Sequence, residues 1–175
     1  MDTEIIAWCK NPERIREILK TNNAEFQGKN HIEETYFQAK TGELILREEN
    51  EKSQLIYSKQ GKSDEESLRY NSLTDSSLKA ILSEAMATTS IIEMERESYS
   101  FDNVSISLDK VKALGQFVKI RATNPHGNLS SEKLTEQLNY YFKLLEINAK
   151  NLVKDSCRDL LKQNSLFSQV LIDDE

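Results

Sequence analysis

The chain is poor in the residues that usually build metal centres and disulfide frameworks. Among 175 residues there are two cysteines, Cys9 and Cys157, and two histidines, His31 and His126. Two cysteines so far apart indicate neither a disulfide framework nor a zinc site, and two histidines argue against a histidine-based metal site. A reducing cytoplasm is the simplest home for such thiols, so we expect a cytoplasmic protein.

Long apolar runs and basic clusters are missing as well. No apolar stretch approaches membrane-spanning length, and the N-terminus lacks the cationic start and apolar core of a signal peptide. Lys and Arg number 23 against 29 Asp and Glu, which gives a formal net charge of -6. This balance argues against a general nucleic-acid surface. We therefore expect neither a membrane nor a nucleic acid polymer as a partner.

The chain instead contains a series of strand-like segments. Glu34-Thr35-Tyr36-Phe37 and Gly42-Glu43-Leu44-Ile45-Leu46-Arg47-Glu48 are typical of two strands joined by a tight turn at Lys40-Thr41-Gly42. We expect strands near 3–9, 33–38, 43–48, 53–59, 66–73, 90–99, 103–109 and 115–123. Capping residues and periodicity predict helices over about 12–20, 75–85, 130–147 and 149–163.

This order of elements predicts an α+β fold. About eight antiparallel strands would form a closed or nearly closed β-barrel, with helices packed outside and a C-terminal helical pair. We expect one domain over residues 1–163 and a flexible acidic tail over 164–175. Leu134, Leu138, Tyr141, Leu145 and Leu152 fall at helical spacing, which predicts core packing, with a homodimer face as the alternative.

Basic residues recur near the ends of successive predicted strands. Arg47 ends one strand, and Leu55-Ile56-Tyr57-Ser58-Lys59 repeats the arrangement. Cations from neighbouring strands that point into one space favour an anion, above all a phosphate chain. The bland alternative is that Arg47, Lys59 and Arg96 are solvent-exposed or pair with Glu48, Glu93 or Glu97.

The ordered set of motifs resembles the CYTH superfamily, the triphosphate tunnel proteins that include class IV adenylate cyclases and thiamine triphosphatases. Asp2-Thr3-Glu4-Ile5-Ile6 stands where that family opens with Glu-x-Glu-x-Lys. The similarity continues through the segments 34–37, 44–48 and 55–59, through Phe101–Asp109 and Leu114-Gly115-Gln116-Phe117, and to Ser156-Cys157-Arg158-Asp159-Leu160-Leu161. It thus spans nearly the whole chain in order.

The resemblance implies a tunnel in which cations grip phosphates and carboxylates hold Mg²⁺ or Mn²⁺. It implies phosphate or nucleotide contacts at Arg47, Lys59, Arg96, Lys119, Arg121, Ser105 and Ser107, and metal ligands at Asp2, Glu4 and Asp109. No residue is identified as catalytic. The metal would be needed only by an active enzyme.

The sequence departs from the family pattern at several of these positions. Ile6, Ile45 and Met94 stand where basic residues are usual, and Lys119-Ile120-Arg121 replaces the terminal Glu-x-Glu. Two metal-binding carboxylates are thus exchanged for two cations, which would repel a divalent ion by roughly several kcal/mol. A strand shift of one residue would instead turn Val118 and Ile120 toward the tunnel.

Three functions follow from this sequence. The first is a tunnel protein that binds a nucleotide or other phosphorylated small molecule, with its metal site and catalytic set eroded. The second is an active metal-dependent adenylate cyclase or organic triphosphatase of the same family. The third is a protein-interaction module without a small ligand.

Overall fold

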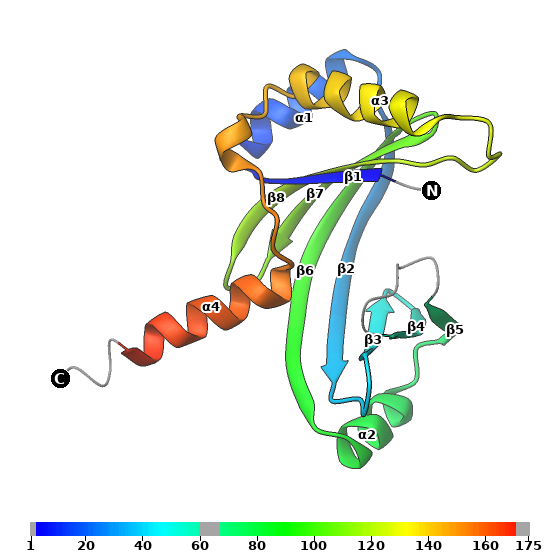
Figure 1. The fold of residues 1–175 in the computed structure, drawn as a ribbon, viewed down its shortest axis with the longest axis vertical. Helices are drawn as coiled ribbons and strands as arrows, with labels where there is room; N and C mark the ends of the chain where they lie inside the picture. Colours follow the sequence, from blue (N-terminus) through cyan, green and yellow to red (C-terminus); the bar gives the residue numbers. More distant parts are fainter. Residues whose placement is uncertain (1–2, 60–66, 171–175) are drawn as a thin grey trace. The chain divides into compact units, whose positions relative to one another are not determined.

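The computed structural model describes residues 3–59 and 67–170. The strands are β1 (Thr3–Trp8), β2 (Glu25–Phe37), β3 (Glu43–Glu49), β4 (Lys52–Ser58), β5 (Leu68–Leu73), β6 (Thr88–Phe101), β7 (Val104–Val111) and β8 (Gly115–Ala122). The helices are α1 (Pro12–Thr21), α2 (Ser76–Ala85), α3 (Ser131–Leu144), the short 3₁₀ turn η2 (Ala149–Asn151) and α4 (Cys157–Val170) (Figure 1).

Within the described residues the strands form one eight-stranded sheet in the order β1-β8-β7-β6-β2-β3-β4-β5. The pairs β1–β8, β7–β8, β2–β3, β3–β4 and β4–β5 are antiparallel. The chain divides into two compact units, which we call unit 1 (Met1–Lys29 with Glu95–Glu175) and unit 2 (Asn30–Met94). The α+β class with an antiparallel sheet is confirmed, whereas a single domain over 1–163 stays a prediction.

In unit 1, α1 and α3 contribute to a core built on one face of the sheet. Alternate residues of three paired strands are buried there, among them Ala7, Ile106 and Ile120. The core also contains Ile15, Ile18 and Leu19 of α1 and Leu134 and Leu138 of α3. Both helices begin at a side-chain cap: Asn11 accepts a hydrogen bond from the Arg14 backbone N–H at 3.1 Å, and Ser130 from that of Lys133 at 3.3 Å.

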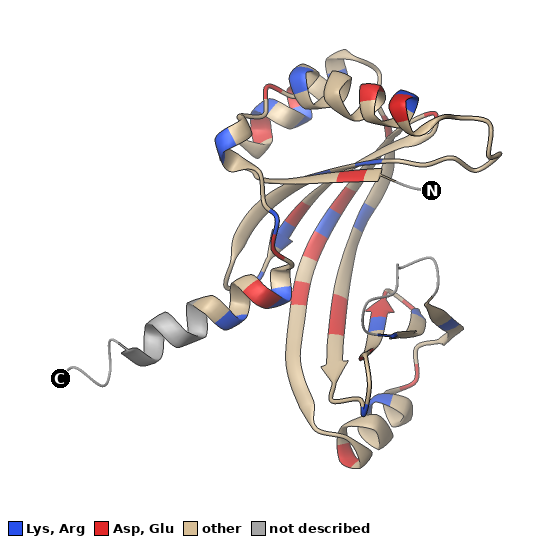
Figure 2. Ribbon diagram, in the orientation of Figure 1, with Lys and Arg blue, Asp and Glu red and all other residues tan. Residues whose placement is uncertain are grey.

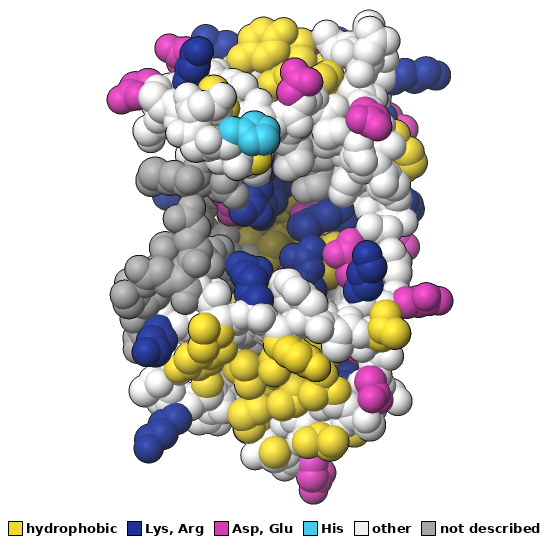
Figure 3. All heavy atoms as spheres, turned by 90° about the vertical axis from the view of Figure 1, so that its right-hand side faces the viewer, with side chains coloured by type: hydrophobic (Ala, Val, Ile, Leu, Met, Phe, Trp, Pro, Cys, Tyr) yellow, Lys and Arg dark blue, Asp and Glu magenta, His cyan; other side chains and the backbone are white. Residues whose placement is uncertain are grey.

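In unit 2, one face of the strands carries Phe37 and Leu46, which are buried. Helix α2 is tied to this face by Lys79, whose ammonium pairs with Glu33 of β2 and Glu48 of β3. Unit 2 also exposes large apolar side chains: Leu68, Tyr70, Leu73, Ile81 and Ile91. In the lower part of the view in Figure 3, where α2 lies, hydrophobic side chains gather on the surface.

Two sequence predictions differ from the structure. Strand β2 begins at Glu25 rather than near residue 33, so it also includes His31. The last helix begins at Cys157, after the 3₁₀ turn, and runs to Val170. Residues 164–170 of the predicted tail are therefore helical, and 171–175 lie outside the described residues. No helix in the described ranges is both long and apolar enough to cross a membrane.

Candidate functional site

The sheet face of unit 1 that points away from the helix-covered core carries polar and charged residues in cross-strand rows. One row joins Glu4 of β1, Arg121 of β8 and Ser105 of β7. The next joins Ile6, Lys119 and Ser107, and the third joins Trp8, Phe117 and Asp109. We call this surface the polar face of unit 1. Six of the residues predicted to bind phosphate or metal therefore lie on one side of three adjacent strands.

The strand register of β8 settles which residues the polar face presents. Val118 and Ile120 are buried in the core with Ile106. Because successive side chains of a strand point to opposite faces, Lys119 and Arg121 lie on the other side. The alternative in which a shift of one residue exposes Val118 and Ile120 to the site is excluded.

Glu4 does not lie alone on this face. Its Oε2 is 2.9 Å from the Lys119 Nζ, and Arg121 is its direct neighbour in the row. The Lys119 side chain is 25% exposed and that of Glu4 44%. Glu4, which the resemblance implied as a metal ligand, is thus paired with a cation from β8.

Arg96 and Asp109 form a second ion pair on the polar face. The Arg96 Nε and Nη2 each donate a hydrogen bond of 2.6 Å to one oxygen of the Asp109 carboxylate. Asp109 is buried, at 7% exposure. Acidic and basic residues are interspersed along β6, as Figure 2 shows. Glu93 and Glu97, the partners that the alternative explanation offered, lie an odd number of residues from Arg96 along β6, which places them on the opposite face.

The three residues predicted to hold a metal do not fit one ion. Asp2 lies outside the described residues. Glu4 and Asp109 are each paired with a cation, and they lie four residues and two strands apart, roughly 13 Å along the sheet and about 10 Å across it. Ligands of one Mg²⁺ must lie about 2.1 Å from it. Across residues 3–59 and 67–170, no group of three or more His, Cys, Asp or Glu could hold a metal ion.

Unit 2 has a polar face of its own. Its central row joins Glu34, Arg47, Gln54 and Asn71 across four strands. The Arg47 guanidinium lies 3.5 Å from Glu34 and 3.6 Å from Glu49. A hollow of about 470 Å³ opens here, lined by Arg47, Glu49, Lys52, Ser53, Gln54, Asn71 and Ser72. Arg47 thus lies on a polar face with Glu34 and Glu49, rather than Glu48, as its partners, and its phosphate-binding role stays a prediction.

Lys59 lies outside the paired strands of unit 2. It is exposed and lies one residue beyond the end of β4. Ile45 pairs with Ile56 and Arg47 with Gln54, so the even-numbered residues of β4 lie on the polar face. Leu55 and Tyr57 lie with Leu44 and Leu46 on the other side. Because Lys59 lies beyond the last paired residue of β4, the register does not place its side chain, and its inward position stays a prediction.

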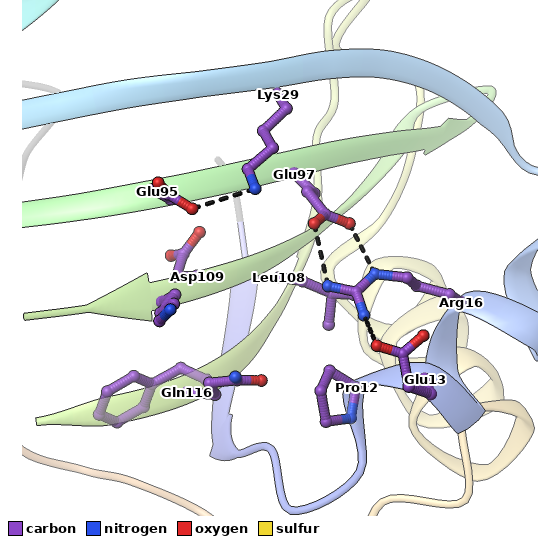
Figure 4. Close-up of a pocket in the computed structure, with 11 residues that line it drawn as sticks. Pro12, Glu13, Arg16, Lys29, Glu95, Glu97, Leu108, Asp109 and Gln116 are labelled. Carbon is purple, nitrogen blue, oxygen red and sulfur yellow. Dashed lines mark hydrogen bonds and ion pairs between the residues drawn. The ribbon is translucent and has the colours of Figure 1, made fainter.

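A further charged cluster lies beside α1 in unit 1, around a hollow of about 180 Å³ that Asp109 and Phe117 also line (Figure 4). The Arg16 Nε and Nη2 of α1 donate to the two carboxylate oxygens of Glu97 at 2.8 and 2.9 Å, and Lys29 lies 3.0 Å from Glu95. The hydrogen bond from Arg16 holds the pKa of Glu97 below its usual value, although burial acts in the opposite direction. The cluster fastens α1 to β6, which is a structural role.

Sequence reasoning missed several polar residues of unit 2, namely Glu34, Glu49, Lys52, Gln54 and Asn71. A signal for them was present, because Glu49 and Lys52 flank the two-residue turn Asn50-Glu51, and Asn50 adopts a positive φ of 55°. Such a turn fixes the register of β3 and β4 and therefore which residues accompany Arg47.

Comparisons with known proteins agree with this architecture. The family model described as CYTH domain matches residues 9–156. A conserved hypothetical protein from Pyrococcus furiosus superposes with a TM-score of 0.72 at 20% identity, covering 91% of this chain and 99% of that one. A candidate adenylate cyclase from Vibrio parahaemolyticus gives 0.75 at 15% identity, covering 92% and 97%.

A third similar structure is a candidate adenylyl cyclase from Hippeastrum for which a dominant triphosphatase activity is reported. It superposes with a TM-score of 0.66 at 12% identity, covering 94% of this chain and 96% of that one. At these identities the structures share the fold. No curated protein sequence matches this chain.

Proposed function

Because this chain belongs to the CYTH domain family, we propose that its polar faces bind a nucleotide or another phosphorylated small molecule without a resident divalent metal. The family fold is that of triphosphate tunnel proteins. We further propose that the metal site and the catalytic set of the family are eroded here.

The observation that carries the proposal is the position of Lys119 and Arg121. Both lie on the polar face of unit 1, in the rows that contain Glu4, Ser105 and Ser107. They occupy the strand where the family's Glu-x-Glu would supply two carboxylates. Ammonium and guanidinium groups pair directly with phosphate oxygens, and neighbouring serine hydroxyls can donate further hydrogen bonds.

The formal charges of this face agree with an anionic ligand. Arg96, Lys119 and Arg121 are cations, whereas Glu4 and Asp109 are the acids among the described residues of the face. The excess is cationic although the whole chain carries a net charge of -6. A cationic surface on an acidic protein supports a role in holding an anion.

The decisive variant restores the family pattern. In the presence of EDTA, inorganic triphosphate and ATP should raise the melting temperature of the wild-type protein. Lys119→Glu/Arg121→Glu should weaken this metal-free binding by at least about 100-fold, because each lost charge-assisted contact contributes roughly 1.5–3 kcal/mol. Lys133→Glu/Lys143→Glu, on the exposed side of α3, makes the same change in net charge and should leave binding unchanged.

Equal binding by the wild type and Lys119→Glu/Arg121→Glu would contradict the proposal. So would wild-type binding that EDTA abolishes.

An active metal-dependent cyclase or triphosphatase is the second candidate, supported by the fold shared with the Hippeastrum protein. Assays of wild-type protein with ATP and triphosphate in Mn²⁺ or Mg²⁺ distinguish the two proposals. Robust metal-dependent release of phosphate or cyclic AMP would replace the first proposal with the second.

A protein-interaction module is the third candidate, and the exposed apolar side chains of unit 2 favour it. It becomes the better account if no phosphorylated compound stabilises the protein with or without metal.

A further inference from the structure

We infer that Asp109 is a built-in counterion that competes with the ligand for Arg96 and thereby limits how tightly the polar face holds a phosphate. This inference rests on the proposed function and assigns Asp109 a role in setting affinity rather than in holding a metal.

The geometry of the pair is the first support. Asp109 binds the Nε and Nη2 edge of Arg96 through two hydrogen bonds of 2.6 Å. A phosphate bound by a guanidinium takes the same fork-shaped arrangement, with two parallel N–H···O bonds. The carboxylate therefore occupies the edge of Arg96 that a phosphate would use.

The place of the pair on the face is the second support. Asp109 lies two residues from Ser107 along β7, and Ser107 is paired with Lys119 of β8. Two residues of a strand span about 7 Å, so a phosphate chain that contacts Lys119 and Ser107 lies within reach of Arg96. At that distance the carboxylate charge also repels the chain.

Burial is the third support. The Asp109 side chain is 9% exposed and that of Arg96 20%, so solvent screens this charge pair less than a surface ion pair. The same row contains the Trp8 and Phe117 rings, whose centroids lie 4.3 Å apart. A carboxylate held beside such groups exerts a stronger field on the ligand than one in water.

The inference makes a signed prediction about Asp109→Asn. Asparagine has the same shape and keeps one acceptor for Arg96, but it carries no charge. Binding of inorganic triphosphate in EDTA, measured by calorimetry at low ionic strength, should become about tenfold tighter, which corresponds to about 1.4 kcal/mol. The gain should shrink as salt is added, since it is electrostatic.

Three further variants identify the cause of the change. Asp109→Glu keeps the charge and should show no gain. Arg96→Gln in the Asp109→Asn background should abolish the gain, because the cation that Asp109 neutralises is then absent. Glu146→Gln is the matched control, because Glu146 forms a comparable two-bond pair with Arg14 on the helix side of unit 1; it should leave triphosphate affinity unchanged. Circular dichroism confirms that each variant is folded before binding is measured.

The outcomes separate this inference from the proposed function. If the wild type binds and folded Asp109→Asn binds equally or more weakly, Asp109 is not a competing counterion, and the proposed function stands. If only Asp109→Asn binds, the counterion role is supported in its strongest form. If neither protein binds triphosphate or ATP, both the proposed function and this inference are wrong.

Discussion

Replacing Glu97 by glutamine tests whether ion pairing fastens α1 to the sheet of unit 1. The change keeps the size of the side chain and removes its charge from the pair with Arg16. Two hydrogen bonds of 2.8 and 2.9 Å join the guanidinium to the carboxylate, and Tyr99 donates a third at 3.3 Å. Glu97→Gln should therefore lower the free energy of unfolding.

The magnitude follows from burial. The side chain of Glu97 is 16% exposed and that of Arg16 33%, so the pair is screened only in part. Hydrogen bonds to charged groups contribute about 1.5–3 kcal/mol, and glutamine keeps one acceptor for Arg16. We expect a loss of about 2 kcal/mol, measured by urea denaturation at neutral pH.

The pH dependence has a definite sign. The pKa of Glu97 lies below its ordinary value of 4.5 in the folded protein, mainly because of the hydrogen bond from Arg16. Stability from such a group is fully present above the unfolded pKa and is lost as pH falls through the folded pKa. The difference between wild type and Glu97→Gln should therefore be constant at neutral pH and shrink below about 4.5.

Glu13→Gln is the control, because Glu13 pairs with the same guanidinium but its side chain is 77% exposed. Exposed pairs contribute about 0–1 kcal/mol, so this variant should change stability little. Equal effects of Glu97→Gln and Glu13→Gln, or an unchanged difference at acidic pH, would refute the reasoning.

Two further predictions concern a turn and a thiol. Gly42→Ala should destabilise the protein by about 2 kcal/mol or more, because Gly42 has a φ of 81° and a new Cβ would lie 2.1 Å from the Ser58 carbonyl oxygen. Gly127→Ala is the control for denaturant midpoints: its φ is 68° with nothing within 4 Å, so it should cost less, and equal costs would contradict the clash. Burial raises the pKa of the Cys9 thiol, so in a Cys157→Ser background Cys9 should react with alkylating reagents more slowly than a free thiol. Unfolding in denaturant should remove the difference, and a fast reaction in the folded protein would contradict the burial.

The sequence was informative where one strand face is fully apolar. Along β8 the alternation of Val118 and Ile120 with Lys119 and Arg121 predicted the correct sides, because burying Lys119 in the core would be costly. Caps such as Asn11 and Asp75 likewise marked the starts of α1 and α2, since each caps its helix through its own side chain.

The sequence was less informative where the structure depends on which strands pair and in which register. The first half of β2, with Gly28 at a φ of 125°, shows no apolar alternation and is held by its place in the sheet. The Arg96–Asp109 pair joins two strands, so it depends on which residues of β6 and β7 come together. The polarity of either residue alone does not predict that contact.

The turn between β7 and β8 carries a consequence for how this domain can diverge. Lys112, Ala113 and Leu114 form it, and Ala113 holds a positive φ of 63°. A one-residue insertion there that shifted the pairing of the two strands would move Lys119 and Arg121 into the core and send Ile120 to the ligand side at once. Substitutions at every second residue of β8 can therefore change ligand preference without altering the core. A change in the length of the β7–β8 turn would alter the core and the ligand-binding face together.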